Sequence, residues 1–201
     1  MNHRTALVVF VVGACFATGS AAQDRVLFRF DQADAAVAWQ TVKDGVMGGR
    51  SESRFRINQD RNLEFFGTLS LENNGGFASV RACGDNLRLN DDDVIAVGVR
   101  GDGRQYGLNV HEGPNSGDNS CRQTFNTKRD EWIEVEFPVA RFAGTWRGSV
   151  LPNEKPEPHR IRGPGFLLGD KKPGPFRLEV EWIEARREAN QDSDVPPKDG
   201  S

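Results

Sequence analysis

The segment Phe176-Arg177-Leu178-Glu179-Val180-Glu181-Trp182 alternates apolar and charged side chains at every position. Successive side chains of a β-strand point to opposite faces of a sheet, so this period of two predicts a strand with one apolar and one polar face. Residues 106–110 and 133–137 repeat the pattern. After Trp182 the apolar positions move to Ile183 and Ala185, and this slip predicts a β-bulge or the end of strand pairing.

Other apolar segments extend the pattern along the chain. Turn residues separate them, as at Asn73-Asn74-Gly75-Gly76 and Gly101-Asp102-Gly103. Helical periodicity is scarce: residues 31–39 are the one candidate for a short helix or an irregular segment, and residues 151–164 hold four prolines and predict a long surface loop. Nine or ten strands without alternating helices predict an all-β sandwich or barrel. The further expected strands are residues 26–30, 53–57, 63–71, 77–82, 94–100, 122–126 and 165–168.

Composition agrees with one globular domain. The chain has 201 residues, enough for a single domain with a substantial core. Its 22 glycines fit short strands joined by frequent turns. With 26 Lys and Arg against 29 Asp and Glu, the formal charge is −3, so there is no basic footprint and no nucleic-acid partner is expected.

The N-terminus has the layout of a secretory signal peptide. Arg4 precedes a nearly unbroken apolar run over residues 6–17, and Ser20-Ala21-Ala22 supplies small residues for cleavage. The run is shorter than the roughly 20 residues that a membrane-spanning helix needs. We therefore expect residues 1–22 to be removed and the mature chain to be exported, periplasmic or extracellular, with no transmembrane segment. Lipoprotein processing at Cys15 is the alternative.

The mature chain is expected to divide into a domain and a tail. Residues 23–187 carry the strand pattern of the sandwich, whereas residues 188–201 lose every apolar period and predict a disordered tail. Two cysteines remain after cleavage, Cys83 and Cys121. In an oxidising compartment they can form one disulfide, or both can stay free thiols in a partly buried sheet.

The usual signatures of catalysis are absent from the sequence. There is no Gly-x-Ser-x-Gly, Walker loop, His-Glu-x-x-His or Cys-x-x-Cys. His111 and Glu112 do not have the spacing of a standard metal site with Cys121, and we expect His111 to be a solvated turn residue. We therefore predict no enzyme activity, no catalytic residue, no metal and no cofactor.

Carboxylates are plentiful on the strands. They fall on the polar phase, where a solvated sheet face is the expected environment, although a concave face would let them line a groove with Trp132. The strand carboxylates are Glu134, Glu136, Glu179 and Glu181.

One run of residues is more specific than any of these patterns: Val42-Lys43-Asp44-Gly45-Val46-Met47-Gly48-Gly49-Arg50-Ser51. It is followed in order by Glu72-Asn73-Asn74-Gly75-Gly76-Phe77, by Arg100-Gly101-Asp102-Gly103-Arg104-Gln105-Tyr106, and by Gln123-Thr124-Phe125 with Trp132. In this order, from about residue 26 to residue 185, the chain resembles the complex I intermediate-associated protein 30 family.

The resemblance implies a galactose-binding-like jelly-roll β-sandwich, related in fold to carbohydrate-binding modules. For mitochondrial members it implies a chaperone-like role in assembling respiratory complex I without enzymatic activity, and it supplies no catalytic residues. The leader here differs from an arginine-rich transit peptide. We therefore expect a non-catalytic extracytoplasmic binding or assembly-factor-like domain that contacts a protein. The alternative is a carbohydrate-binding module of an exported protein.

Several residues are candidates for binding. Met47, set between glycines, is expected either to plug the end of the core or to present a soft apolar contact to a partner. Arg81, Arg100 and Tyr106 are the favoured candidates for ligand contact, and Tyr106 and Trp132 would stack on sugars in the alternative function. The full set of expected binding residues is Asp44, Met47, Arg50, Asn73, Asn74, Arg81, Arg100, Asp102, Tyr106, Gln123 and Trp132.

Overall fold

The structure is a computed structural model that describes residues 24–42, 51–82, 84–113, 119–146 and 149–187. The predicted signal peptide, the Asp44, Met47 and Arg50 loop, Cys83 and the predicted tail lie outside the described residues. Within those ranges the chain forms thirteen strands and three 3-10 helices. The strands are β1 (Arg25–Arg29), β2 (Trp39–Val42), β3 (Glu52–Ile57), β4 (Leu63–Leu69), β5 (Ala78–Ala82), β6 (Asp93–Gly101), β7 (Gln105–His111), β8 (Asn119–Asn126), β9 (Trp132–Pro138), β10 (Ala143–Trp146), β11 (Ser149–Leu151), β12 (Gly163–Leu168) and β13 (Gly174–Arg187). The 3-10 helices are η2 (Glu72–Asn74), η3 (Val139–Arg141) and η4 (Pro158–Arg160).

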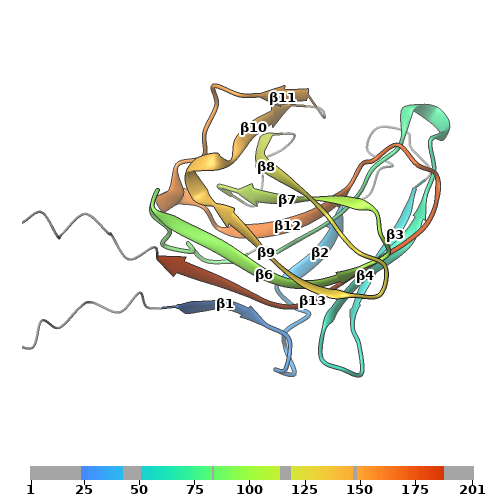
Figure 1. The fold of residues 1–201 in the computed structure, drawn as a ribbon, viewed down its shortest axis with the longest axis horizontal. Helices are drawn as coiled ribbons and strands as arrows, with labels where there is room; N and C mark the ends of the chain where they lie inside the picture. The colour runs from blue at the N-terminus through green and yellow to red at the C-terminus, as the bar shows by residue number, and fades with distance from the viewer. Residues whose placement is uncertain (1–23, 43–50, 83, 114–118, 147–148, 188–201) are drawn as a thin grey trace, which may run out of the picture.

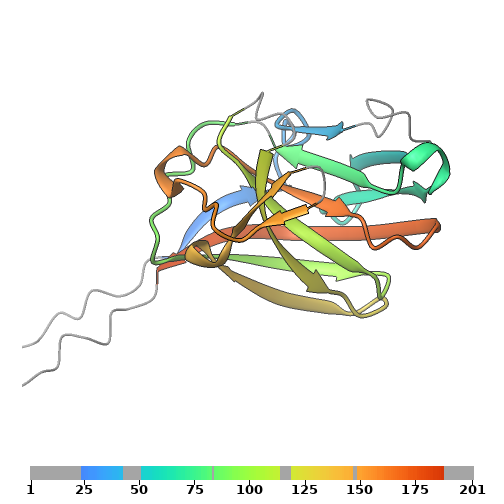
Figure 2. The ribbon, with the colours of Figure 1, turned by 90° about the horizontal axis from the view of Figure 1, so that it is seen from above.

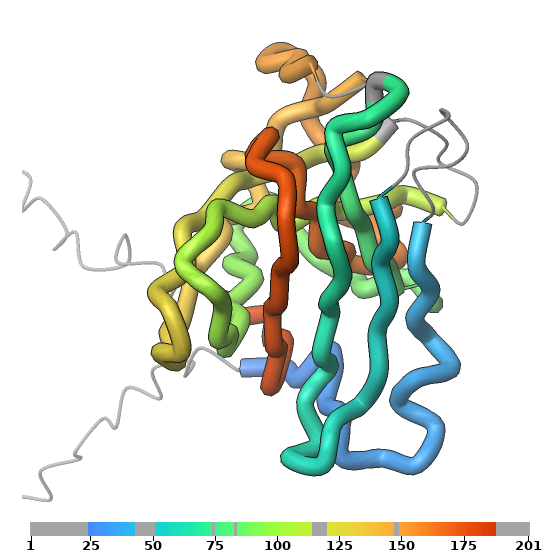
Figure 3. The backbone as a smooth tube through the Cα atoms, turned by 90° about the vertical axis from the view of Figure 1, so that its right-hand side faces the viewer, coloured from blue at the N-terminus to red at the C-terminus, as the bar shows by residue number. Residues whose placement is uncertain are grey.

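The strands form two antiparallel sheets that pack face to face (Figures 1 and 2). Sheet A has the order β3-β4-β13-β6-β9, and β1 also pairs with β13. Sheet B has the order β11-β10-β8-β7-β12-β5-β2. Figure 3 shows β2 beside β3, where the edges of the two sheets meet. This architecture confirms the predicted all-β sandwich.

The core lies between the sheets and uses the apolar phase of each strand. Leu178 and Val180 of β13 are fully buried, as the alternation predicted. In sheet B, Trp39 stacks on Phe166 with ring centroids 6.2 Å apart and meets the edge of Phe28 at 5.4 Å. Such apolar burial is the main favourable contribution to folding.

A β-bulge in β13 changes which side chains face the core. The pairing of β13 with β6 shifts register between Val180 and Trp182, so Glu181 is the extra residue of the bulge. Ile183 is consequently buried in the core, and Trp182 lies over the outer surface of Gly98. The sequence pattern predicted that Trp182 lies on the apolar face and that the alternation slips by one residue after it. That placement is wrong, because the bulge lies one residue earlier.

Two other differences from the sequence pattern are local. The short strands β2, β10 and β11 were not expected, whereas residues 33–38 form turns, which agrees with the irregular segment expected there as the alternative to a short helix. The proline-rich segment 151–164 is anchored, because Ile161 is fully buried in the core. The turn expected at residues 73–76 is present, and its backbone has positive φ at Asn73 (54°) and Gly76 (119°). Among the described residues, no helix is long and apolar enough to span a bilayer.

Two polar side chains on the outer side of sheet B are buried. Asn109 is 3% exposed and His111 is 6% exposed. His111 was expected in a solvated turn, but β7 extends through it and pairs it with Gly163 of β12. Burial, together with the positive charges of Arg81 and Arg122, lowers the pKa of His111 to about 4.

The bulge in β13 gives a first prediction, which compares deletion of Glu181 with Glu181→Ala. Deletion removes the extra residue and leaves Val180 and Ile183 on the core face with Trp182 outward, so we expect the variant to fold with a loss of less than about 2 kcal/mol in the free energy of unfolding. Glu181→Ala keeps the bulge and should change that free energy by less than about 0.5 kcal/mol. Urea denaturation checks both. A deletion variant that fails to fold, beside a stable Glu181→Ala, would contradict the assignment of Glu181 as the extra residue of the bulge.

The buried His111 gives a second prediction, on acid stability. Its folded pKa is depressed, so between pH 6.5 and 4 the unfolded chain binds a proton that the folded chain does not, and stability falls as the pH falls. We expect a loss of about 2 kcal/mol between pH 6.5 and 4.5. In His111→Gln this part of the pH dependence should disappear, as measured by denaturation at several pH values. An unchanged slope in His111→Gln would show that other groups cause it.

Candidate functional site

The outer face of sheet A carries a cross-strand row of polar side chains. The register places Arg56 of β3 opposite Glu64 of β4, and Glu64 opposite Glu179 of β13. On the other side of β13, Glu179 is opposite Arg100 of β6, which is opposite Trp132 of β9. Neighbouring strands lie about 4.8 Å apart, so side chains at directly opposite positions meet. We call these five residues, together with Arg177, the charged row.

Glu179 is the buried centre of the charged row. Its side chain is 1% exposed, and the Arg100 Nη2 donates to both of its oxygens at 3.0 and 2.9 Å. The Arg177 Nη2 lies 2.6 Å from Oε1, and the Asn58 Nδ2 donates to Oε2 at 3.0 Å. Burial favours a higher pKa for Glu179, but the hydrogen bond from Arg100 and the charge of Arg177 bring that pKa below its usual value.

Arg177 bridges this carboxylate to the next one. Its Nε lies 2.8 Å from the Oε1 of Glu64, whose Oε2 lies 2.5 Å from the Nε of Arg56. The Glu64 side chain is only 5% exposed. Two adjacent buried carboxylates repel each other unless cations lie between them, and the three arginines supply that compensation.

An exposed tryptophan ends the charged row. Trp132 is 38% exposed, and the Arg100 guanidinium lies 5.0 Å from the centre of its ring, in the geometry of a cation–π contact. A surface hollow of about 280 Å³ beside it is lined by Arg100, Asp102 and Arg177, among others. A second hollow of about 430 Å³ lies at the other end, around Arg56 and Asp60.

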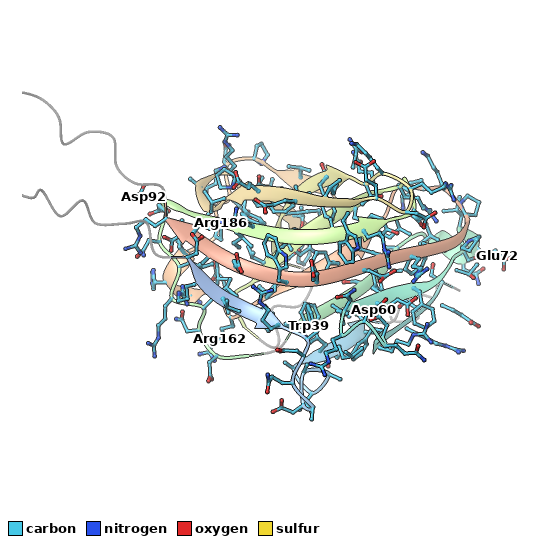
Figure 4. All side chains as sticks on the ribbon, turned by 60° about the horizontal axis from the view of Figure 1, so that its bottom comes forward. Trp39, Asp60, Glu72, Asp92, Arg162 and Arg186 are labelled. Carbon is cyan, nitrogen blue, oxygen red and sulfur yellow. The ribbon has the colours of Figure 1, made fainter. Side chains whose placement is uncertain are left out.

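A second aromatic and charged group lies further along the same face, near Arg186 in Figure 4. The Arg186 guanidinium lies 5.4 Å from the centre of the Trp182 ring and pairs with Glu134 at 2.5 Å and Glu136 at 3.2 Å. The hydrogen bond from Arg186 lowers the pKa of Glu134. These two glutamates face solvent as predicted, whereas Glu179 is buried because β13 lies in the middle of the sheet.

Three residues expected to bind a ligand instead hold the fold together. Tyr106 is 1% exposed, and its hydroxyl donates to the Asp102 Oδ1 at 3.1 Å. The Asp102 Oδ2 accepts the backbone N–H of Arg177 at 3.0 Å. The Gln123 Nε2 donates to the carbonyl of Pro138 at 2.9 Å. Tyr106 therefore lies in the core and is not exposed at the surface, where the predicted contact with a ligand would require it to be.

The outer face of sheet B holds a different cluster, which we call the basic pocket: Arg81, Asn109, His111 and Arg122. Gly165 of β12 lies between Arg81 of β5 and Asn109 of β7 in the register, and Asn109 is opposite Arg122 of β8. The Arg122 Nε donates to the Asn109 Oδ1 at 2.7 Å. The pocket therefore draws on four neighbouring strands.

Neighbouring glycines make room for these side chains. A Cβ at Gly107 would lie 2.8 Å from the Arg122 Cδ. A Cβ at Gly165 would lie 3.2 Å from the His111 Nε2 and 3.1 Å from the Arg81 Cβ. All three distances are shorter than ordinary contacts, so the backbone itself forms the floor beneath the arginines and the histidine.

Three buried nitrogens of the basic pocket lack hydrogen-bond partners in the described part of the chain. Neither ring nitrogen of His111 makes a hydrogen bond, although both are buried, and the buried Arg81 Nε also makes none. Neither Arg81 nor Arg122 forms an ion pair with any described carboxylate. Burial lowers the pKa of Arg122.

No metal site emerges from the described ranges, which contain no group of three or more His, Cys, Asp or Glu side chains placed to hold an ion. Cys121 is half-buried with a free thiol. Burial, with the negative charges of Glu112 and Glu154, raises the pKa of Cys121 to about 11, so the thiol is protonated at neutral pH. Its predicted partner, Cys83, lies outside the described residues.

The predicted binding residues therefore divide between two opposite faces. Arg100 and Trp132 meet on sheet A, Arg81 lies on sheet B, and Asn73 is exposed at its turn. The side chain of Asn74, like Asp44, Met47 and Arg50, lies outside what the structure describes. Sequence reasoning missed Glu64, Arg177, Asn109 and Arg122. Glu64 could have been identified from the sequence, because it is the one charged residue of the Leu63–Leu69 strand.

Solved structures support the fold. A family 11 carbohydrate-binding module from Clostridium thermocellum, in complex with a beta-1,3-1,4-mixed-linked tetrasaccharide, has a TM-score of 0.57 at 14% identity, covering 85% of this chain and 98% of that one. The family 11 module of the cellulase Lic26A-Cel5E from the same organism has a TM-score of 0.58 at 13% identity, covering 84% and 96%. At such identities the similarity shows a shared fold alone.

A curated relative corrects the predicted location. "Complex I intermediate-associated protein 30, mitochondrial" from Mus musculus is 28% identical over 182 residues, covering 80% of this chain and 56% of that protein. The chain thus spans about half the length of this relative. The relative is named as a mitochondrial protein, which contradicts the predicted exported location.

Family membership follows from a broader match. The family model described as "Complex I intermediate-associated protein 30 (CIA30)" matches residues 28–180. That range runs from β1 into β13 and includes every described strand between them. Because the match covers more than half of the sequence, this chain belongs to the complex I intermediate-associated protein 30 family.

Proposed function

We propose that this chain is a non-catalytic protein-binding domain of the assembly-factor type, which contacts its partner through the outer face of sheet A. The observation that carries the proposal is the exposed Trp132 beside the charged row, in a chain of this family. The mouse relative supports a protein partner, since its name associates it with an intermediate of complex I.

The composition of this face suits a protein interface. Tryptophan and arginine are enriched among the residues that contribute most to protein–protein binding. Trp132 is held against Arg100, which is itself held by the buried Glu179, so the aromatic ring is ordered before a partner arrives. Ordering in the free protein reduces the entropy lost on binding.

The charge that the charged row presents to solvent is positive. In the charged row, the side chains of Arg56 and Arg177 are 63% and 52% exposed, whereas those of Glu64 and Glu179 are at most 5% exposed. The guanidinium groups therefore surround the carboxylates and reach the surface. We expect acidic side chains on the part of the partner that meets this face, because complementary charge speeds association and fixes orientation.

The carboxylates of this face are poor candidates for acid–base catalysis. A general acid at neutral pH needs a raised pKa, but arginines lower the pKa of both Glu179 and Glu134. Their oxygens are also occupied by guanidinium hydrogen bonds. These contacts support a binding role for the face.

Carbohydrate binding is the second candidate function. The observation in its favour is the pair of tryptophans, Trp132 and Trp182, on one face of a sandwich whose fold is shared with carbohydrate-binding modules. Sugar rings stack on aromatic side chains, so Trp132 would contribute to either function. Whether the domain retains a protein or a glycan distinguishes the two functions.

A binding experiment tests both functions. The domain, Trp132→Ala and the control Trp146→Ala, an exposed tryptophan of sheet B, are immobilised and presented with a membrane-protein extract and, separately, with a glycan array. We expect a defined protein complex to be retained by the parent and by Trp146→Ala, and retention to fall at least tenfold in Trp132→Ala and in high salt. Thermal denaturation verifies that all three remain folded. Binding of glycans but of no protein, with loss in Trp132→Ala, would favour the carbohydrate function and reject the first.

The absence of catalysis is tested separately. We expect no turnover of glycoside, ester or peptide substrates by the purified domain, because its strand carboxylates are paired and ionised. Product formation is measured over a broad substrate panel, with Glu134→Gln as the matched variant. Activity that copurifies with the domain and is lost in Glu134→Gln would reject the binding-domain proposal.

A further inference from the structure

The geometry points to a ligand site on the face opposite to the proposed protein interface. We propose that the basic pocket of sheet B (Arg81, Asn109, His111 and Arg122) binds a small hydroxylated oxyanion, of the class of sugar acids and sugar phosphates. The contacts that carry this proposal lie within sheet B, and it does not depend on the function proposed for sheet A.

The first step is the unpaired charge. On sheet A, Arg56, Arg100 and Arg177 each contact a buried carboxylate at 2.5 to 2.9 Å. Arg81 and Arg122 are half-buried, yet neither has a carboxylate partner among the described residues. Partly buried cations without a counter-ion are costly, and an oxyanion between them would supply charge-assisted hydrogen bonds to both.

The second step is the unsatisfied histidine. The side chain of His111 is buried beside the arginines, and both of its ring nitrogens lack a hydrogen-bond partner. A neutral imidazole has one donor and one acceptor nitrogen. A hydroxyl group can accept from the first or donate to the second, so a ligand with hydroxyls next to its anionic group satisfies the histidine as well as the arginines.

The third step is the floor of the pocket. Gly107, Gly163 and Gly165 occupy outward positions of β7 and β12, next to Asn109 and His111. The side chain of Arg122 lies over Gly107 and those of Arg81 and His111 lie over Gly165, so the missing Cβ atoms let these groups gather close to the backbone at the centre of the sheet. None of the described outward residues of β5, β7, β8 and β12 is aromatic, so recognition relies on charge and hydrogen bonds rather than on stacking of a neutral sugar.

The test titrates the full chain with three sugars that differ in one group: glucuronate, glucose 6-phosphate and neutral glucose. The imidazole resonances of His111 in NMR spectra report occupancy of the pocket, and calorimetry gives the affinity. We expect at least one of the two anionic sugars to bind and to shift the His111 resonances, with at least tenfold weaker binding of glucose. The tighter of the two anions decides whether the ligand carries a carboxylate or a phosphate.

Variants assign the binding to the pocket. Arg81→Gln removes a cation that has no carboxylate partner among the described residues, so we expect the fold to be retained and the affinity for the anionic sugar to fall at least tenfold. Arg54→Gln is the matched control, with the same change of charge at a side chain that is 75% exposed on sheet A, and its affinity should equal that of the parent. Acetate and inorganic phosphate, which lack the adjacent hydroxyls, should bind at least tenfold more weakly than the sugar anions.

Several results would overturn the proposal. Equal binding of glucose would remove the requirement for an anion, and equal binding of acetate or inorganic phosphate would remove the requirement for hydroxyls. An equal loss of affinity in Arg54→Gln and Arg81→Gln would show that binding depends on the total charge of the protein and not on the basic pocket. If Arg81→Gln unfolds, the parent chain still tests the proposal. Anionic sugars that leave the His111 resonances of the parent unmoved at millimolar concentration do not occupy the basic pocket, and this result would overturn the proposal.

Discussion

β13 pairs with β4 and β6 along much of its length and with β1 at its end, so its register determines the faces of most of sheet A. The strand has to direct Leu178 and Val180 inward and, a few residues later, Ile183 and Ala185 inward as well. A strict alternation cannot do both. The extra residue at Glu181 resolves the conflict, and Gly98 on β6 leaves the space that the displaced Trp182 ring occupies.

The same register produces the charged row. Glu179 lies one position away from Leu178 and faces outward, where the pairings of β13 place it between Glu64 and Arg100. In the middle of a sheet this position is shielded from water, so the carboxylate is ionised only because Arg100 and Arg177 compensate its charge. The exposed parts of the charged row are then the outer arginines and Trp132, which gives the row a positive and aromatic surface.

The two faces differ in how their arginines are satisfied. On sheet A the fold itself supplies carboxylates, and the arginines act mainly as structural partners that also reach the surface. On sheet B the described residues supply Asn109 and an unpaired His111, but no carboxylate. Fold similarity to carbohydrate-binding modules does not choose between these faces, since related sandwiches carry different sites. The side chains distinguish the two faces, and they suggest a macromolecular contact on sheet A and a small anion on sheet B.

The sequence by itself determined the longer strands, though not the short β2, β10 and β11, because the period of two is a local property that follows from the pleat of a single strand. It also determined the family, through ordered motifs that the family model matches over residues 28–180. Arg100 and Trp132 were recognised from these motifs. The tertiary structure decided which of the other residues belong together. Arg81, His111 and Arg122 come from three strands, Tyr106 turns into the core, and Glu179 is buried rather than solvated. Strand order and register join positions that are distant along the chain, and no local periodicity contains that information.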